Sequence, residues 1–131
     1  MRRKELINYW IESSDIDFST MVSLFRTKHY SWSLFIGHLV IEKLLKAYYI
    51  KEFNDNPPLI HNLLRLAVKA KINLDSENEE FFSEVTTFNI NARYDDYKME
   101  FYKKCTKEYT IYWYRKIKEN RKWIKKELLK L

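Results

Sequence analysis

Apolar residues recur at intervals of three and four along most of the chain, which is the spacing of one helix face. The clearest example predicts a helix from about residue 4 to 28, with apolar positions at Leu6, Ile7, Trp10, Ile11, Phe18, Met21, Val22 and Phe25. A second helix is predicted from Ser31 or Trp32 to Phe53. This helix is apolar on more than one side, with Trp32 on its main apolar arc. We therefore expect it to be central or to pack on a second subunit.

The second half of the chain continues the pattern in shorter pieces. Pro57 and Pro58 must end the second helix, because proline lacks the backbone donor and restricts the residue before it. The further predicted elements are a short helix at about 60–71, a helix from about 75 to 90, a loop at about 94–101 and a last helix at about 106–129. Ser76 followed by Glu79 fits a capping box at the start of the longer helix.

These elements predict an all-α fold. Long helices of similar length joined by short turns pack antiparallel, so we expect an up-and-down four-helix bundle with an extra short helix in the middle crossover. A chain of 131 residues suits one core, and a single domain over residues 1–131 is predicted. The single glycine and two prolines of the chain also favour long helices.

Composition excludes several classes of protein. No apolar run is long enough to span a bilayer, and the first residues lack the apolar segment of a secretory signal, so we expect a cytoplasmic protein without a membrane. The only glycine is Gly37, which excludes the glycine motifs of phosphate loops, dinucleotide sites and nucleotidyltransferase catalytic sites. No cofactor is therefore expected. Asp95 and Asp96 are adjacent without an evident third ligand, so no metal site is expected either.

Charge is unevenly distributed along the chain. The net charge is +6, but residues 98–131 contain twelve lysines and arginines against four acidic residues. Such a basic segment suits nucleic acid, a nucleotide phosphate or an acidic partner. The alternative is a solvated helix face that pairs with the acidic residues between positions 75 and 84.

A charged stripe interrupts the most apolar helix. His38, Glu42 and Lys46 recur at four-residue intervals and therefore share one face. Glu42 and Lys46 form a favourable pair one turn apart, which is the simplest reason for their presence. If the stripe instead borders a cleft, we expect Glu42 to pair with Arg93 and Lys46 to meet phosphate.

Two further positions carry candidate chemistry. His61 lies near the start of the short helix, where it either orients that helix or has a catalytic or phosphate-binding role. Arg93 offers a planar fork for phosphate, and Tyr94 offers a ring for base stacking. Alternatively, Arg93 is held by an internal carboxylate and Tyr94 fills the core.

Three segments together resemble the HEPN family of helical domains. They are "IEKLLKAYYI" at 41–50, "HNLLRLA" at 61–67 and "FNINARYDDYKMEFYKK" at 88–104. The usual family pattern is E-K-x-L-K-A, then H-[DN]-L-x-x-L, then a-R-Y. The order and spacing of the segments agree with this pattern, and the similarity covers essentially the whole chain.

The resemblance implies a four-helix bundle that commonly dimerises and often works beside a minimal nucleotidyltransferase as its substrate-binding subunit. It thus implies a nucleotide-binding, non-catalytic protein, with a toxin–antitoxin pair as one setting. The expected nucleotide- or phosphate-binding residues are Glu42, Lys46, His61, Arg93 and Tyr94, with no catalytic residues. A homodimer through the first two helices is expected.

Other members of the family are toxins that cleave RNA, and they carry an R-x(4–6)-H motif, in which four to six residues separate an arginine from a histidine. No histidine follows Arg93, and His29 lies only three residues after Arg26. Metal-independent RNA cleavage usually needs a general base with a near-neutral pKa, which histidine supplies. A ribonuclease with a degenerate site and a structural dimer without a ligand stay as alternatives, and an enzyme is the less favoured interpretation.

Overall fold

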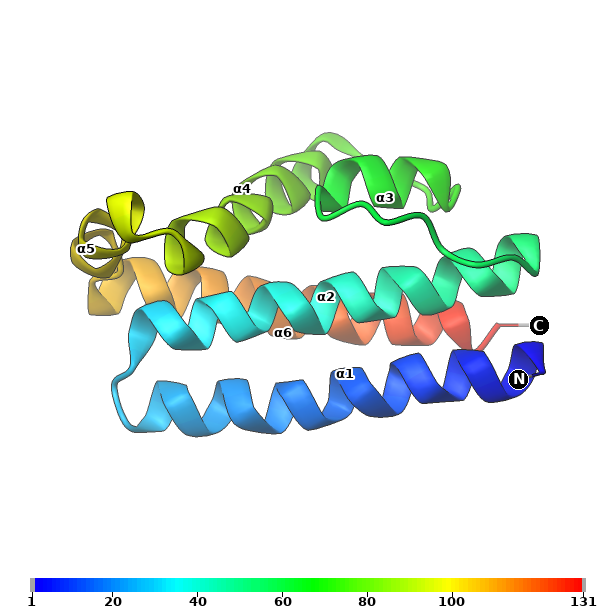
Figure 1. Ribbon diagram of the computed structural model, residues 1–131, viewed down its shortest axis with the longest axis horizontal. Coiled ribbons are helices and arrows are strands. Elements are labelled where there is room, and N and C mark those ends of the chain that lie inside the picture. Colours follow the sequence, from blue (N-terminus) through cyan, green and yellow to red (C-terminus); the bar gives the residue numbers. More distant parts are fainter. Residues whose placement is uncertain (1, 131) are drawn as a thin grey trace.

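A computed structural model describes residues 2–130, and the helices in this range are α1 (Arg3–Arg26), α2 (Tyr30–Phe53), α3 (Leu63–Lys69), α4 (Ser76–Arg93), α5 (Asp95–Lys104) and α6 (Lys107–Leu128). The four longer helices α1, α2, α4 and α6 run in alternating directions, so the start of α1 and the end of α6 lie at the same end of the bundle (Figure 1). The predicted all-α, up-and-down four-helix fold is confirmed.

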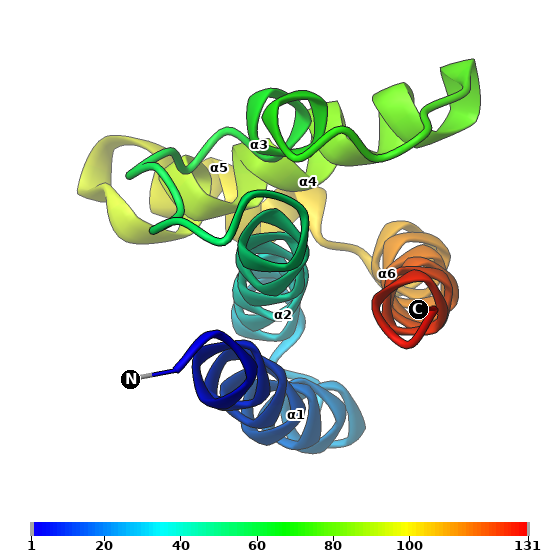
Figure 2. The same ribbon diagram turned by 90° about the vertical axis from the view of Figure 1, so that its right-hand side faces the viewer.

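Helix α2 lies at the centre of the molecule. It packs against α1 on one side, α6 on another and the α3–α4 pair on a third (Figure 2). Half of its 24 residues are buried. The predicted central position of this helix is therefore confirmed, and it accounts for the two-sided apolar pattern.

Small residues let the long helices approach each other closely. The Ser14 hydroxyl of α1 donates to the Val40 carbonyl at 2.8 Å, and the Ser33 hydroxyl of α2 donates to the Met21 carbonyl at 2.9 Å. A Cβ atom on Gly37 would lie only 2.6 Å from Cδ1 of Ile117. The absence of a side chain at this position therefore leaves room for the Ile117 side chain of α6 against α2.

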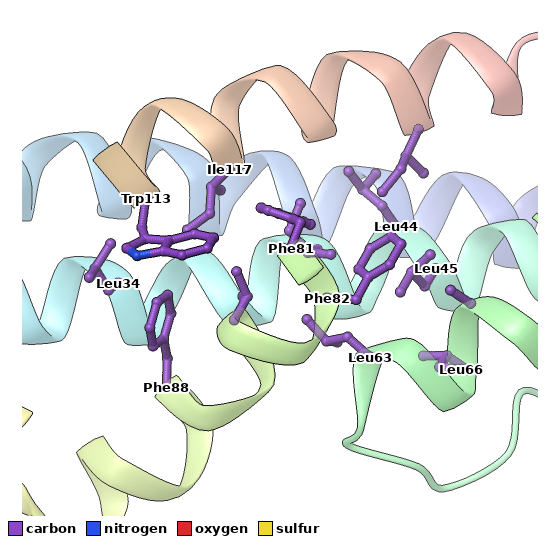
Figure 3. Packing of buried hydrophobic residues seen from close by; sticks show 14 of the residues in the cluster. Leu34, Leu44, Leu45, Leu63, Leu66, Phe81, Phe82, Phe88, Trp113 and Ile117 are labelled. Atoms are coloured by element: carbon purple, nitrogen blue, oxygen red, sulfur yellow. The ribbon is translucent and has the colours of Figure 1, made fainter. Parts of the chain in front are cut away.

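The hydrophobic core follows the length of α2 and takes residues from all six helices. At one end, the rings of Phe88 and Trp113 lie next to Leu34 (Figure 3), with 6.3 Å between the two ring centres. At the other end, Leu63 and Leu66 of α3 close the core next to Leu45 (Figure 3). Within residues 2–130, no helix is both long and apolar enough to cross a bilayer.

Two predicted helix starts require correction. The short helix begins at Leu63, not near residue 60, because the Asn62 side chain accepts the backbone N–H of Arg65 at 3.0 Å and caps the helix there. The capping box of α4 is formed by Asp75 and Asn78, one residue before the predicted Ser76–Glu79 pair. Asp75 is an equally good N-cap, so the composition of this turn allowed either register.

The prediction of a loop at residues 94–101 is wrong, because most of this segment belongs to α5. The segment contains neither glycine nor proline. Asp95 and Asp96 occupy the first turn and Lys103 and Lys104 the last, which is the charge order that stabilises a helix dipole. Only Tyr94 is extended between α4 and α5, so the change in chain direction is confined to one residue.

Candidate functional site

The predicted charged stripe of α2 forms a compact cluster around Glu42. The Glu42 side chain is only 5% exposed. Its Oε1 accepts a hydrogen bond from Nδ1 of His61 at 2.9 Å, and its Oε2 lies 3.6 Å from Nζ of Lys46. The Lys46 ammonium also lies 4.8 Å from the centre of the Trp10 ring of α1. The cluster therefore connects α1, α2 and the segment before α3.

His61 is held in this position from two sides. The Asn62 cap sets the direction in which the chain enters α3, and the His61 carbonyl accepts a hydrogen bond from Nε2 of His38 at 3.2 Å. Since His38 must donate through Nε2, its Nδ1 carries no proton in the neutral ring, and this atom is buried without a partner in the described part of the chain. Burial lowers the pKa of His38 below its ordinary value, despite the opposing charge of Glu42.

The cluster neutralises its own charges. A buried carboxylate is costly unless cations and hydrogen-bond donors offset its desolvation. Lys46 and the N–H of His61 do so for Glu42. The Lys46 ammonium is therefore already paired with the Glu42 carboxylate and is not free to pair with an incoming phosphate. The His61 side chain is 63% exposed. Glu42 binds Nδ1 of this ring and not its second nitrogen, Nε2.

The other two predicted site residues lie elsewhere. Arg93 ends α4, and its Nη1 donates to the Asn89 side chain at 3.4 Å, so the expected Glu42–Arg93 pair does not form. Ala92, the residue before Arg93, lines a surface hollow that Trp32 of α2 also lines. Glu42 lies ten residues beyond Trp32 on α2, or about 15 Å along the helix axis. Tyr94 is exposed, so the alternative of a core tyrosine is also wrong.

A small hollow where α4 meets α5 contains residues that the sequence analysis did not select. We call it the α4–α5 corner; it has a volume of about 190 Å³ and is lined by Ser31, Trp32, Ala92, Lys98, Met99, Phe101 and Tyr102. Trp32 is 47% exposed and Tyr102 is 67% exposed. Nζ of Lys98 lies 5.8 Å from the centre of the Trp32 ring. The corner thus combines exposed rings with a cation.

Two errors caused these residues to be missed. Trp32 was expected on the buried arc of its helix, but it lies in the first turn of α2, and Figure 1 shows that α2 starts at the end of the bundle where α5 lies. Lys98 was assigned to a loop. A signal was present in the sequence, because tyrosines and lysines recur between residues 94 and 104 without glycine or proline.

A family model of the HEPN domain matches residues 7–128 of the chain. The chain belongs to the HEPN domain family. Searches of curated proteins and of solved structures found no match. The Glu42–His61 hydrogen bond joins the first two of the three HEPN-like segments, whereas the third contributes Arg93 and Tyr94 at a separate place.

The basic last helix of this HEPN domain is partly neutralised by other helices. Lys116 pairs with Glu77 of α4 at 3.0 Å, as the alternative of a solvated, paired helix predicted. Arg121 and Lys125 pair instead with Asp15 of α1, at 3.0 and 2.9 Å. Although burial opposes the shift, these hydrogen bonds hold the pKa of Asp15 below its usual value. The cations of α6 therefore help to hold this helix against both α1 and α4.

Neither a metal centre nor a reactive thiol is indicated in residues 2–130. This part of the HEPN domain contains no group of three or more histidine, cysteine, aspartate or glutamate side chains placed to hold a metal ion. Burial raises the pKa of Cys105 to about 12, so its thiol stays protonated near neutral pH.

The buried His38 makes the stability of the HEPN domain depend on pH. Its pKa in the folded state lies below the ordinary 6.5, so on acidification the unfolded chain binds the proton first. The free energy of unfolding should therefore fall below about pH 6.5, by up to about 1.4 kcal/mol per pH unit for this proton. Urea denaturation between about pH 7 and pH 5 measures this slope.

The His38→Gln variant should have a smaller slope, because the amide can donate to the His61 carbonyl but does not titrate. His29→Gln, at an exposed position in the turn between α1 and α2, is the matched control and should retain the wild-type slope. Equal slopes in wild type and His38→Gln would contradict the assignment.

Proposed function

We propose that this HEPN domain binds a nucleotide at the α4–α5 corner and serves as the non-catalytic, substrate-binding partner of a minimal nucleotidyltransferase. The observation that carries the proposal is the combination of exposed Trp32 and Tyr102 rings with the Lys98 ammonium around one hollow. Aromatic faces stack on nucleobases, and lysine and arginine bind phosphate. Arg93 and Tyr94, two of the predicted nucleotide-binding residues, are exposed at the same junction.

The cations of the corner are available to a phosphate. Lys98 pairs with an exposed carboxylate, with Nζ 3.4 Å from Oδ1 of Asp95, and such surface pairs are worth little. Arg93 does not line the hollow itself but follows Ala92, which does, and it donates to the uncharged Asn89 amide at the long distance of 3.4 Å. The pair of Lys46 with Glu42 differs in being buried, with side chains 14% and 5% exposed, and the Trp10 ring covers the ammonium as well. We therefore assign Glu42, Lys46 and His61 to holding the bundle together and place the nucleotide at the corner.

Calorimetric titration of the purified chain with ATP should show saturable binding. The double variant Trp32→Ala/Lys98→Ala should weaken it at least about tenfold, since stacking on one aromatic ring is worth about 1–3 kcal/mol. Phe53→Ala/Lys71→Ala, which removes an exposed ring and the lysine 5.5 Å from its centre at the other end of α2, is the control and should bind like wild type. Absence of binding in wild type, or equal loss in both variants, would refute the corner as the site.

The proposal includes two protein partners. A homodimer through the first two helices was expected, but the apolar surplus of α2 is used inside the chain. We propose instead that copies meet on the outer face of α1, where Tyr9 and Ile16 are exposed two turns apart. The nucleotidyltransferase partnership rests on the family membership and on the resemblance of the HEPN segments.

Co-expression with the product of a nucleotidyltransferase gene encoded beside this one should give a complex that elutes as one peak in size-exclusion chromatography with light scattering. The chain alone should elute as a dimer, and Tyr9→Lys/Ile16→Lys should elute as a monomer. Two separate peaks after co-expression would count against the partnership, and a monomeric wild type would count against the dimer.

A second candidate function is RNA cleavage, and the Glu42–His61 hydrogen bond favours it. A carboxylate that accepts from Nδ1 fixes the tautomer and orientation of the imidazole and leaves Nε2 as a possible base. Here Nδ1 is bound at 2.9 Å and the ring is exposed. The same arrangement is equally suited to orienting the start of α3, which is the role that the leading proposal gives it.

Incubation of the purified chain with single-stranded RNA distinguishes the two functions. The leading proposal predicts no cleavage above that of the His61→Gln variant. Cleavage that is lost in His61→Gln but retained in Trp32→Ala would instead support the ribonuclease. Far-ultraviolet circular dichroism of both variants checks that the helices are intact.

A further inference from the structure

A second and larger cleft lies on another side of the bundle from the α4–α5 corner. We call it the α4–α6 cleft; it has a volume of about 640 Å³. The first half of α4 extends sideways past α6 (Figure 2), and the cleft lies between these helices, with Tyr48 of α2 also in its lining. A space of this size is sufficient for a small organic ligand.

Aromatic side chains form much of the cleft lining: Tyr48, Phe81, Tyr112, Trp113 and Trp123. The Tyr112 ring is exposed and meets the Trp113 ring edge-on, with 5.0 Å between ring centres. The Tyr112 ring also has a cation beside it within the protein, with Nζ of Lys116 5.7 Å from the ring centre. Such rings attract cations through their negative faces and pack well against methylene groups.

The charge of the cleft is opposite to that of the whole chain. The chain carries a net charge of +6, yet the cleft is lined by five carboxylates, Asp75, Glu77, Glu80, Glu119 and Glu127, against two ammonium groups, Lys116 and Lys130. Both lysines are already paired with carboxylates of the cleft. Lys116 pairs with Glu77 at 3.0 Å and more weakly with Glu119 at 3.9 Å, and Lys130 pairs with Glu127 at 2.9 Å. The potential in the cleft is therefore negative.

Helix capping explains only part of this excess. Asp75 caps α4 and Glu77 lies in its first turn, where carboxylates stabilise the helix dipole. Glu119 and Glu127 belong to the middle and the end of α6, and a carboxylate at a helix C-terminus opposes the dipole. Two of the three acidic residues of the basic helix α6 thus line this cleft, each beside a lysine three residues away: Glu119 beside Lys116 at 3.9 Å and Glu127 beside Lys130 at 2.9 Å.

We propose that the α4–α6 cleft binds a small organic cation with several ammonium groups, of the linear polyamine class. The methylene segments of such a ligand would pack on the Tyr112 and Trp123 rings, and its ammonium groups would pair with Glu80 and Glu119. A bare divalent metal ion fits less well, because it needs several oxygen ligands around one point, and the described residues form no such group. The proposal is independent of nucleotide binding at the α4–α5 corner.

Calorimetric titration of the full chain with spermidine tests the proposal. We expect saturable binding that is at least tenfold tighter than that of Mg²⁺ at matched ionic strength. Glu80→Gln/Glu119→Gln should weaken spermidine binding at least tenfold. The control Glu12→Gln/Glu100→Gln removes the same charge from exposed positions on α1 and α5 and should bind like wild type.

A second pair of variants tests the aromatic contribution. Tyr112→Ala should weaken spermidine binding, whereas Tyr97→Ala, at a tyrosine of similar exposure on α5, should not. Lack of saturable binding in wild type, equal affinity for Mg²⁺, or equal loss in target and control variants would each overturn the proposal. All four substitutions to glutamine are at exposed positions, and circular dichroism checks that the helices persist.

Discussion

The burial of α2 on three sides is the constraint on which the rest of the structure depends. A helix in this position supplies the apolar surface against which α1, α4 and α6 pack. It also makes every polar atom on α2 costly unless that atom is paired. Ser33 meets this requirement with a hydrogen bond across helices and Glu42 with a lysine and a histidine beside it, whereas Nδ1 of His38 stays unpaired within the described residues.

The same constraint separates stability from ligand binding in this HEPN domain. Charges at the buried middle of α2 are stable only when they are paired within the chain, and Glu42 is paired with Lys46 and His61. Charged and aromatic side chains at the ends and outer faces of the bundle are under no such requirement. The α4–α5 corner and the α4–α6 cleft both lie there, and they have opposite chemistry: the corner combines rings with a cation, and the cleft combines rings with carboxylates.

The position of α4 gives rise to both of these sites. This helix crosses the bundle at an angle instead of lying parallel to its neighbours (Figure 2). Its C-terminal end meets α5 near the start of α2, and its N-terminal end projects past α6. If α4 lay parallel to α6, the two helices would bury their facing side chains against each other, and neither hollow would have its present lining.

The sequence by itself determined the helices, the all-α bundle, the family segments and the shared face of His38, Glu42 and Lys46. These features depend on spacing within one helix, which a periodic pattern records directly. Only the tertiary structure decided that α2 is central, that Glu42 is bound to His61 and not to Arg93, and that Trp32 is exposed beside Lys98. The offset and crossing angle between helices set these relations, and neither quantity is encoded in the spacing of residues along a single helix. The loop prediction within residues 94–104 was wrong for a different, local reason. The polar composition of this segment resembles a loop, although its charges are ordered as in a helix.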